Sequence, residues 1–418
     1  MLEGATMKKI LFLAEAVSLA HVGRPLVLAE WAKMNGFEIY FACSDGGLVK
    51  TNTNPQEYNL HSLFTINSQL FYDRVNVANF FYTSSELKNY VQFYIKLIIM
   101  INPDLIVSDF RLTASISAEL MNKPLLNLSN AYWCPNYSCH FPAPEFSIFK
   151  YLPQKSSDLL FSLIRPILFK TFGKELNQLR EHFGLTRKSD FRVLYTDGTY
   201  TAYLYMQDFI NLKNLPKNHF YLGPVIWSPK KDGQKIDFKG QNYVYITMGS
   251  SGENKWLPLI IAAVLKLNYQ IILSGINESE KMELLHTFPQ LLGKSIIEPL
   301  ISAEMILKHC RLTVCHGGSG TVYQSLSHGT PVLCLPKNPD QSLVSMALEE
   351  KNLGRFLSCK NTNPLNIKST IIECLSNEIL KENAKYYSKK IQLWDTKSHW
   401  NEFLIKFKTD SKSAKEIA

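Results

Sequence analysis

The feature that most constrains this chain is a glycine-rich turn between a strand and a helix, within residues 309–341. An apolar run at 312–315 predicts a strand, a helical pattern follows to about 327, and 331–335 predict a further strand. The turn itself consists of His316, Gly317, Gly318, Ser319, Gly320 and Thr321. Glycines let the backbone approach a ligand closely, and the N-terminus of the following helix presents free N–H groups and the positive end of its dipole. The stretch therefore predicts an anion site, most often one for phosphate.

Length and composition favour a globular protein with two domains. A chain of 418 residues can form two domains of roughly 200 residues, each with its own core. No run reaches the ~20 apolar residues that would span a bilayer. Residues 10–22 follow two lysines and are apolar, but Glu15 interrupts them and an α/β pattern follows instead of a signal-peptide cleavage site. We therefore expect a cytoplasmic protein.

Charge and cysteine content bound the partners. The eight cysteines show no paired metal-ligand spacing, and several lie in apolar strands, as buried thiols do in a reducing compartment. The net charge of +9 serves solubility or attracts anionic partners, such as nucleotide-sugars or an acidic membrane face. No basic motif interleaved with aromatic residues points to nucleic acid.

The pattern of the first half of the chain predicts an open α/β sheet. Residues 8–14 predict a strand, 15–23 a loop, a helix opened by Pro25 follows, and 37–43 predict the next strand. Such a β-α-β unit implies a parallel sheet. A later strand over 102–108 ends at Asp109. In sheets of this kind the functional side lies at the carboxyl ends of the strands.

Two residues at such ends could carry chemistry. His21 lies in the predicted loop after the first strand, and Asp109 directly follows a later one. A histidine can remove a proton from a hydroxyl, and a neighbouring carboxylate fixes its tautomer. The plainer alternative is an ordinary loop histidine and a helix N-cap, and spacing alone favours that alternative.

Residues 130–170 are rich in aromatic residues and prolines and end in an apolar helix with Arg165 and Lys170. Three interpretations are open: an irregular packed loop with a buried helix, the wall of an acceptor pocket, or a helix lying on a membrane surface.

The domain order follows from composition. We expect a first domain over 1–220, a linker over 221–240, and a second domain over 241–377 that opens with a strand ending at Gly249, Ser250 and Ser251. An amphipathic helix over 378–407 is expected to pack back on the first domain, followed by a disordered tail over 408–418.

Taken together, these motifs resemble the family 1 glycosyltransferases, and within them the bacterial macrolide and antibiotic branch. The signature is carried by IEPLISAEMILKHCRLTVCHGGSGTVYQSLSHGTPVLCLPKNPDQ, and LAHVGRPLVLAEWAKMNGFEIYFAC, DLIVSDF, YLGPV and VYITMGSSG match further segments along nearly the whole chain. The resemblance implies the GT-B fold, in which two Rossmann-like α/β domains with parallel sheets face each other across a cleft. It also implies that the domain over 1–220 is acceptor-binding and the domain over 241–377 donor-binding.

The resemblance also assigns roles. His21 takes the place of the general base and Asp109 that of its partner. The donor-binding positions are Gly249, Ser250, Ser251, His316, Gly317, Gly318, Ser319, Gly320, Thr321, Gln324, Asp340 and Gln341. Asp340 and Gln341 match the pair that binds the hydroxyls of the donor sugar. No Asp-x-Asp motif is present to hold a divalent ion, so we expect metal-independent transfer with inversion and no cofactor.

Two departures from the family pattern bear on the site. The family's Gly-His-x-x-Pro loop is one residue longer here, as Ala20-His21-Val22-Gly23-Arg24-Pro25. Gln324 stands where the family has a glutamate that reaches the ribose hydroxyls, eight positions after His316. An amide accepts less strongly than a carboxylate, which suits a deoxyribose. A dTDP-sugar and a UDP-sugar are therefore both open as donor.

The expected function is thus transfer of a hexose-type sugar from a UDP- or dTDP-sugar to a hydroxyl of a hydrophobic small molecule or lipid, with peripheral contact to the inner face of the membrane left open. The alternatives are a nucleotide-sugar 2-epimerase of the same fold and a catalytically silent nucleotide-sugar-binding protein. The sequence does not identify the sugar, the acceptor or the oligomeric state.

Overall fold

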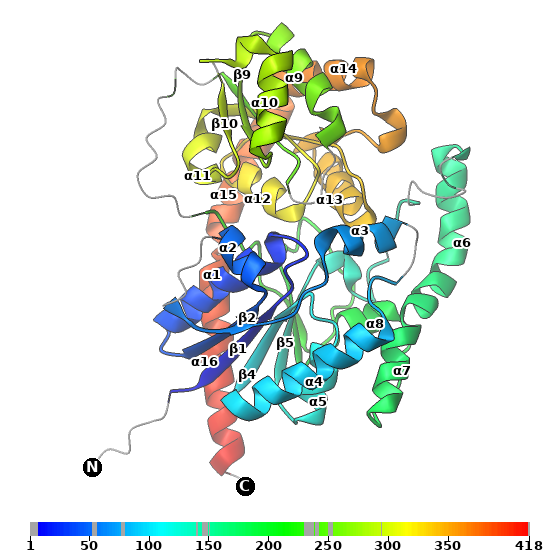
Figure 1. Ribbon diagram of the computed structural model, residues 1–418, viewed down its shortest axis with the longest axis vertical. Helices are drawn as coiled ribbons and strands as arrows, with labels where there is room; N and C mark the ends of the chain where they lie inside the picture. Colours follow the sequence, from blue (N-terminus) through cyan, green and yellow to red (C-terminus); the bar gives the residue numbers. More distant parts are fainter. Residues whose placement is uncertain are drawn as a thin grey trace. The chain divides into compact units, whose positions relative to one another are not determined.

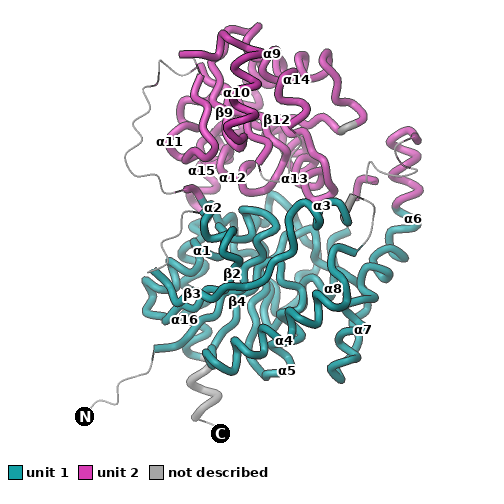
Figure 2. Tube along the Cα trace, viewed as in Figure 1, with its two compact units in different colours: residues 1–139, 162–227, 395–418 teal, residues 140–161, 228–394 magenta. Residues whose placement is uncertain are grey.

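The chain forms two compact units (Figure 2). The computed structural model describes residues 7–51, 57–76, 80–138, 141–143, 149, 151–229, 238, 242–249, 254–293 and 295–416. Unit 1 comprises residues 1–139, 162–227 and 395–418, and unit 2 comprises 140–161 and 228–394. Among the described residues, no helix has both the length and the apolar character needed to cross a bilayer.

Unit 1 is built on a seven-stranded sheet in the order β3-β2-β1-β4-β5-β6-β7, and every neighbouring pair is parallel. Its strands are β1 (Lys9–Ala14), β2 (Glu38–Cys43), β3 (Asn59–Ser62), β4 (Leu105–Asp109), β5 (Leu125–Ser129), β6 (Tyr200–Tyr203) and β7 (His219–Tyr221). The central strand β4 is buried along its whole length, as expected for a parallel strand covered on both faces.

The helices of unit 1 cover this sheet (Figure 1). They are α1 (Ala20–Met34), α2 (Asp45–Thr51), α3 (Ser68–Asn76), α4 (Ser84–Ile101), α5 (Ala114–Leu120), α7 (Lys174–His182), α8 (Phe191–Tyr195) and α16 (Thr396–Glu416). One core joins α1 and α16 to the sheet through residues such as Leu28, Trp400, Phe12 and Val107. Helix α6 (Gln154–Phe172) begins among the residues of unit 2 and ends among those of unit 1.

The C-terminal segment differs from the single helix expected over 378–407. Helix α15 (Glu378–Trp394) ends before Asp395, whose φ of 45° lies in the left-handed region, and α16 follows as a separate helix. Trp400 on α16 is fully buried, and its indole N–H donates to the Leu28 carbonyl at 3.1 Å. Helix α16 continues to Glu416, past the point where we expected a disordered tail.

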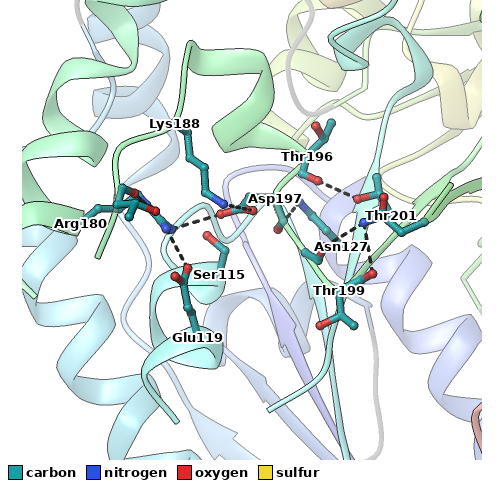
Figure 3. Close-up of polar contacts among 12 residues, drawn as sticks. Ser115, Glu119, Asn127, Arg180, Lys188, Thr196, Asp197, Thr199 and Thr201 are labelled. Atoms are coloured by element: carbon teal, nitrogen blue, oxygen red, sulfur yellow. Dashed lines mark hydrogen bonds and ion pairs between the residues drawn. The ribbon is translucent and has the colours of Figure 1, made fainter. Parts of the chain in front are cut away.

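A buried polar network ties α7 to its neighbours within unit 1 (Figure 3). The Arg180 side chain is fully buried and pairs with Glu119 at 2.7 Å and Asp197 at 3.2 Å. Lys188 pairs with the other oxygen of Asp197 at 3.2 Å. Burying a guanidinium without partners costs free energy. Helix α7 therefore packs where Arg180 can reach these carboxylates.

Unit 2 repeats the same architecture with a six-stranded parallel sheet in the order β10-β9-β8-β11-β12-β13. Its strands are β8 (Tyr243–Thr247), β9 (Gln270–Ser274), β10 (Ile296–Glu298), β11 (Cys310–Cys315), β12 (Val332–Cys334) and β13 (Gly354–Phe356). Its helices are α9 (Leu257–Lys266), α10 (Glu278–Thr287), α11 (Ala303–Ile306), α12 (Ser319–Ser327), α13 (Pro339–Glu350), α14 (Pro364–Ser376) and α15. The expected pair of Rossmann-like parallel-sheet domains is confirmed.

Candidate active site

The sheet of unit 1 reverses its strand order between β1 and β4. In open α/β sheets, ligands bind at the carboxyl ends of the strands at such a point. The last residue of β1, Ala14, is the register partner of Asp109, and the Glu15 backbone N–H donates to the Asp109 carbonyl at 3.2 Å. Both predicted catalytic residues of the first domain belong to this point, since α1 follows β1 and Asp109 ends β4.

His21 lies against Asp109. Its Nδ1 is 2.7 Å from Asp109 Oδ1, and the carboxylate is 1% exposed while the His21 side chain is 18% exposed. With the proton on Nδ1, His21 donates to the carboxylate and Nε2 carries the lone pair, which is the tautomer a general base requires. The structure therefore brings these two predicted residues together.

His21 is not in a loop, as we expected, but in the first turn of α1. The helix begins at Ala20, and the Gly23 N–H donates to the Leu19 carbonyl at 2.9 Å. Pro25 lies inside the helix and not at its start. Its missing N–H deprives only the His21 carbonyl of an intrahelical donor, so the first turn tolerates it.

Arg24, one turn after His21, was not among the site residues predicted from the sequence. This 6%-exposed side chain donates to both oxygens of Asp109, from Nε at 3.0 Å and from Nη2 at 2.8 Å, and Nη1 donates to Asn130 Oδ1 at 3.3 Å. Arg24 Nη2 is also 2.7 Å from His21 Nδ1, but it can only donate, so a bond there would require the other tautomer. The carboxylate is the stronger acceptor, which favours the proton on Nδ1.

An aromatic cluster begins at the His21 imidazole. Phe110 stacks on it with ring centroids 4.8 Å apart, and its φ of 57° is strained for a bulky residue. Phe71, Phe81 and Tyr195 lie against Phe110 with centroids between 5.6 and 5.7 Å. Phe110 thus connects the His21 imidazole to a larger aromatic cluster of unit 1.

A buried ion pair supports the end of β1. Glu15 and Arg111 are 2.9 Å apart and almost fully buried, and Arg111 Nη2 donates to the Ala14 carbonyl at 2.8 Å. Burial raises the pKa of the Glu15 carboxyl in spite of Arg111 and the Tyr82 hydroxyl, which donates to it at 2.8 Å. The pair holds the end of β1, from which the site is built.

In unit 2 the strand order reverses between β8 and β11, and the predicted donor-binding turns lie there. Gly249 follows β8, and His316 follows β11. A Cβ on Gly249, whose φ is +60°, would come 2.5 Å from His316 Cε1, and a Cβ on Gly318 would come 2.5 Å from His316 Nε2. The imidazole is held between two glycines, so a side chain at either position would displace it.

His316 is buried and neutral. Burial lowers its pKa to about 4, and Nδ1 has no hydrogen-bond partner in the described part of the chain. A neutral imidazole can donate one hydrogen bond. Buried ring nitrogens usually have a partner, so a ligand that hydrogen-bonds His316 Nδ1 would fit this site.

Two helices, α12 and α13, lie at the glycine turn, and the contact of α13 includes the Gln341 carbonyl oxygen, 3.1 Å from a Cβ placed on Gly317. Helix α12 starts at Ser319 with Gly318 as its N-cap, and no side chain caps its free N–H groups. A Cβ on Gly317 would meet Ser345 Oγ of α13, so the glycine turn lies against that helix. The structure thus joins the turn to the first turn of α13, which contains Asp340 and Gln341.

The remaining predicted donor residues occupy defined places. Thr321 and Gln324 lie on α12 and are half-buried. Gln341 is 3% exposed, and its amide oxygen accepts from the Lys337 backbone N–H at 2.7 Å. Ser250 and Ser251 lie outside the described residues. No group of three or more His, Cys, Asp or Glu that could hold a metal occurs among the residues the structure describes.

Comparison with known proteins shows relatives along most of the chain. A family model described as Erythromycin biosynthesis protein CIII-like, C-terminal domain, matches residues 259–391. A PGL/p-HBAD biosynthesis glycosyltransferase of Mycobacterium tuberculosis is 31% identical over 392 residues, which cover 91% of this chain and 88% of the relative. A PGL/p-HBAD biosynthesis rhamnosyltransferase of Mycobacterium bovis is 31% identical over 387 residues, covering 91% of this chain and 83% of the relative.

Solved structures share the fold. The glycosyltransferase of kitacinnamycin superposes with a TM-score of 0.71 at 13% identity, over 96% of this chain and 99% of its own. Glycosyltransferase VinC in complex with DTDP superposes with a TM-score of 0.63 at 15% identity, over 96% of this chain and 100% of its own. With relatives matched along nine-tenths of its length, the chain belongs to the family 1 nucleotide-sugar glycosyltransferases of GT-B fold.

Proposed function

We propose that this glycosyltransferase moves a hexose-type sugar from a UDP- or dTDP-sugar to a hydroxyl of a hydrophobic acceptor, with inversion at the anomeric carbon and without a metal ion. The observation that supports this most is the placement of two sets of groups, each at the switch point of its own sheet. Unit 1 supplies the His21–Asp109 pair, and unit 2 supplies His316 between Gly249 and Gly318.

In the acceptor step, His21 Nε2 takes the proton of the acceptor hydroxyl. The oxygen forms a bond to the anomeric carbon as the bond from that carbon to the diphosphate oxygen breaks. Attack from the side opposite the leaving diphosphate inverts the configuration in a single displacement. Asp109 holds the Nδ1 proton and stabilises the imidazolium that results, and Arg24 fixes the carboxylate.

In the donor step, negative charge develops on the leaving nucleoside diphosphate. Backbone N–H groups at the start of α12 and the N–H of neutral His316 would donate to it. Preformed donors in a buried place stabilise such charge without having to reorganise. Asp340 and Gln341, in the first turn of α13, would bind the sugar hydroxyls. A rhamnosyltransferase among the relatives supports a hexose-type sugar.

Position 324 bears on the nucleotide. Gln324 lies on α12, in the helix that begins at the diphosphate turn. A carboxylate accepts from two ribose hydroxyls, whereas an amide oxygen suits one. The VinC structure with DTDP shows that this fold accommodates a thymidine nucleotide in a neighbour. We therefore favour a dTDP-sugar over a UDP-sugar as the donor, and the donor panel below compares the two.

The test is a donor panel with the full chain. We expect dTDP-sugars to raise the melting temperature and to be turned over with a hydroxyl-bearing hydrophobic acceptor, because ligand binding to the native state stabilises it. The product should have the opposite anomeric configuration by NMR, and EDTA should leave the rate unchanged. Gln324→Glu should improve UDP-sugar turnover.

Each other result has a definite meaning. A clear preference of the wild type for UDP-sugars would contradict the inference from Gln324. Retention of configuration, or loss of activity in EDTA, would contradict the mechanism. Nucleotide binding without any transfer would favour the silent binding protein, and a donor whose sugar is epimerised at C2 would favour the epimerase.

A further inference from the structure

Helix α6 has an exposed apolar face. Helix α6 exposes three aliphatic side chains along one side: Leu159 is 66% exposed, Leu163 is 68% and Ile167 is 66%. Their spacing of four residues puts them on one helix face. The other side of α6 is anchored, since Phe161 is 8% and Phe169 is 7% exposed.

Positive charge lies on the same face. Lys155, Leu159, Leu163, Pro166 and Lys170 follow one another at intervals of three or four residues and are all exposed. A lysine therefore stands at each end of the apolar row. At a rise of 1.5 Å per residue, the two lysines are about 22 Å apart along the axis.

No carboxylate balances these lysines within the helix. Asp158 is the only acidic residue in the α6 sequence, and it is half-buried. It accepts from the Ala143 backbone N–H at 2.8 Å and from the Gln154 amide at 2.8 Å, and so lies away from the exposed row. The face is apolar along its centre and cationic at both ends.

This charge pattern selects among occupants. A second copy of the chain would bring Lys155 against Lys155 in a parallel pairing, or Lys155 against Lys170 in an antiparallel one. Like charges in contact oppose both arrangements. An anionic lipid surface offers negative headgroups to the lysines and hydrocarbon to the aliphatic row, which is the pattern of a helix lying in the membrane interface.

We propose that the exposed face of α6, defined by Lys155, Leu159, Leu163, Pro166, Ile167 and Lys170, docks the enzyme reversibly on an anionic phospholipid surface. The aliphatic side chains enter the headgroup–hydrocarbon boundary, and the lysine ammonium groups stay at headgroup level with their stems along the apolar row. The helix lies in the plane of the membrane and does not cross it. The proposal does not depend on the donor or acceptor assignment.

The test is co-sedimentation of the full chain with vesicles, either of phosphatidylglycerol and phosphatidylcholine in equal parts or of phosphatidylcholine alone. We expect binding to the anionic vesicles only, weakened by salt. The affinity of the Leu159→Gln/Leu163→Gln/Ile167→Gln variant for anionic vesicles should fall by at least about tenfold. The Lys155→Gln/Lys170→Gln variant should lose roughly fivefold for each lysine.

Matched controls change the same residue types elsewhere. Ile379→Gln/Leu393→Gln/Ile405→Gln removes three aliphatic side chains that are also well exposed, at 62%, 84% and 59%. Lys368→Gln/Lys389→Gln lowers the net charge by the same amount as the α6 lysine variant. Both controls should bind as the wild type does, and all variants should unfold at the wild-type temperature.

Several results would overturn the proposal. The wild type could stay in the supernatant with anionic vesicles, the α6 variants could bind undiminished, or the controls could lose as much as the α6 variants. A concentration-dependent dimer that the α6 aliphatic variant dissolves, without vesicle binding by the wild type, would assign the face to a second copy instead.

Discussion

At the scale of single residues, Arg24 holds the His21–Asp109 pair by donating to both oxygens of the Asp109 carboxylate. Arg24 contacts both members only because α1 begins at Ala20, which places His21 and Arg24 one turn apart. Pro25 suggested a later start, since proline prefers the first turn of a helix. The local signal was misleading because Pro25 costs only one intrahelical bond, while packing of the following turns fixes the helix.

Replacing Arg24 tests whether it positions the base. Arg24→Met should lower kcat by roughly tenfold to a hundredfold with donor KM unchanged, because Asp109 loses its two other hydrogen bonds and no longer holds His21 in one orientation. Arg24→Lys should recover part of the loss, since a point charge cannot replace the bidentate contact. Steady-state kinetics and thermal unfolding together check this. A fall in stability with full kcat would mean that Arg24 is structural only.

At the scale of elements, segments with a clear apolar run were predictable, including the short strand β12, and short strands without such a run were not. The strands β1, β2, β4, β8, β9 and β11 coincide with apolar runs evident in the sequence. Strands β3, β6, β7 and β13 were missed, because they have only three or four residues and obtain their pairing from the sheet. The two-glycine contact with His316 is also a tertiary feature, since Gly249 is remote in sequence.

That contact can be broken with one methyl group. Gly318→Ala would place a Cβ 2.5 Å from His316 Nε2 and displace the imidazole. The affinity of the variant for a nucleoside diphosphate should fall roughly tenfold to a hundredfold, as expected for loss of a hydrogen bond to a charged group. The control Gly46→Ala has nothing within 4 Å of its Cβ and should bind as the wild type does. Calorimetric titration decides, and equal affinities of both variants would remove His316 from the donor site.

At the scale of the whole molecule, the sequence indicated two α/β units, and both exist with parallel sheets. The allocation of residues between them was less accessible. The sequence placed 140–161 in the first domain, whereas the structure groups them with unit 2. There the Lys360 ammonium donates to the Leu152 carbonyl at 2.9 Å, a contact across more than two hundred residues. No local pattern could have shown it.

The central claim is that the two units divide the work: unit 1 activates the acceptor through His21, and unit 2 binds the donor through His316 and the start of α12. A single variant separates the two functions. His21→Ala removes the imidazole of unit 1 and leaves every described donor-site contact within unit 2 as it is.

The decisive measurement is therefore donor affinity and transfer rate in His21→Ala beside the wild type, with the donor that the panel identifies. The affinity for the nucleotide-sugar should stay within about twofold, while transfer should fall by about 10²–10⁴-fold, the range for loss of a general base. Transfer at the wild-type rate in His21→Ala would contradict the account.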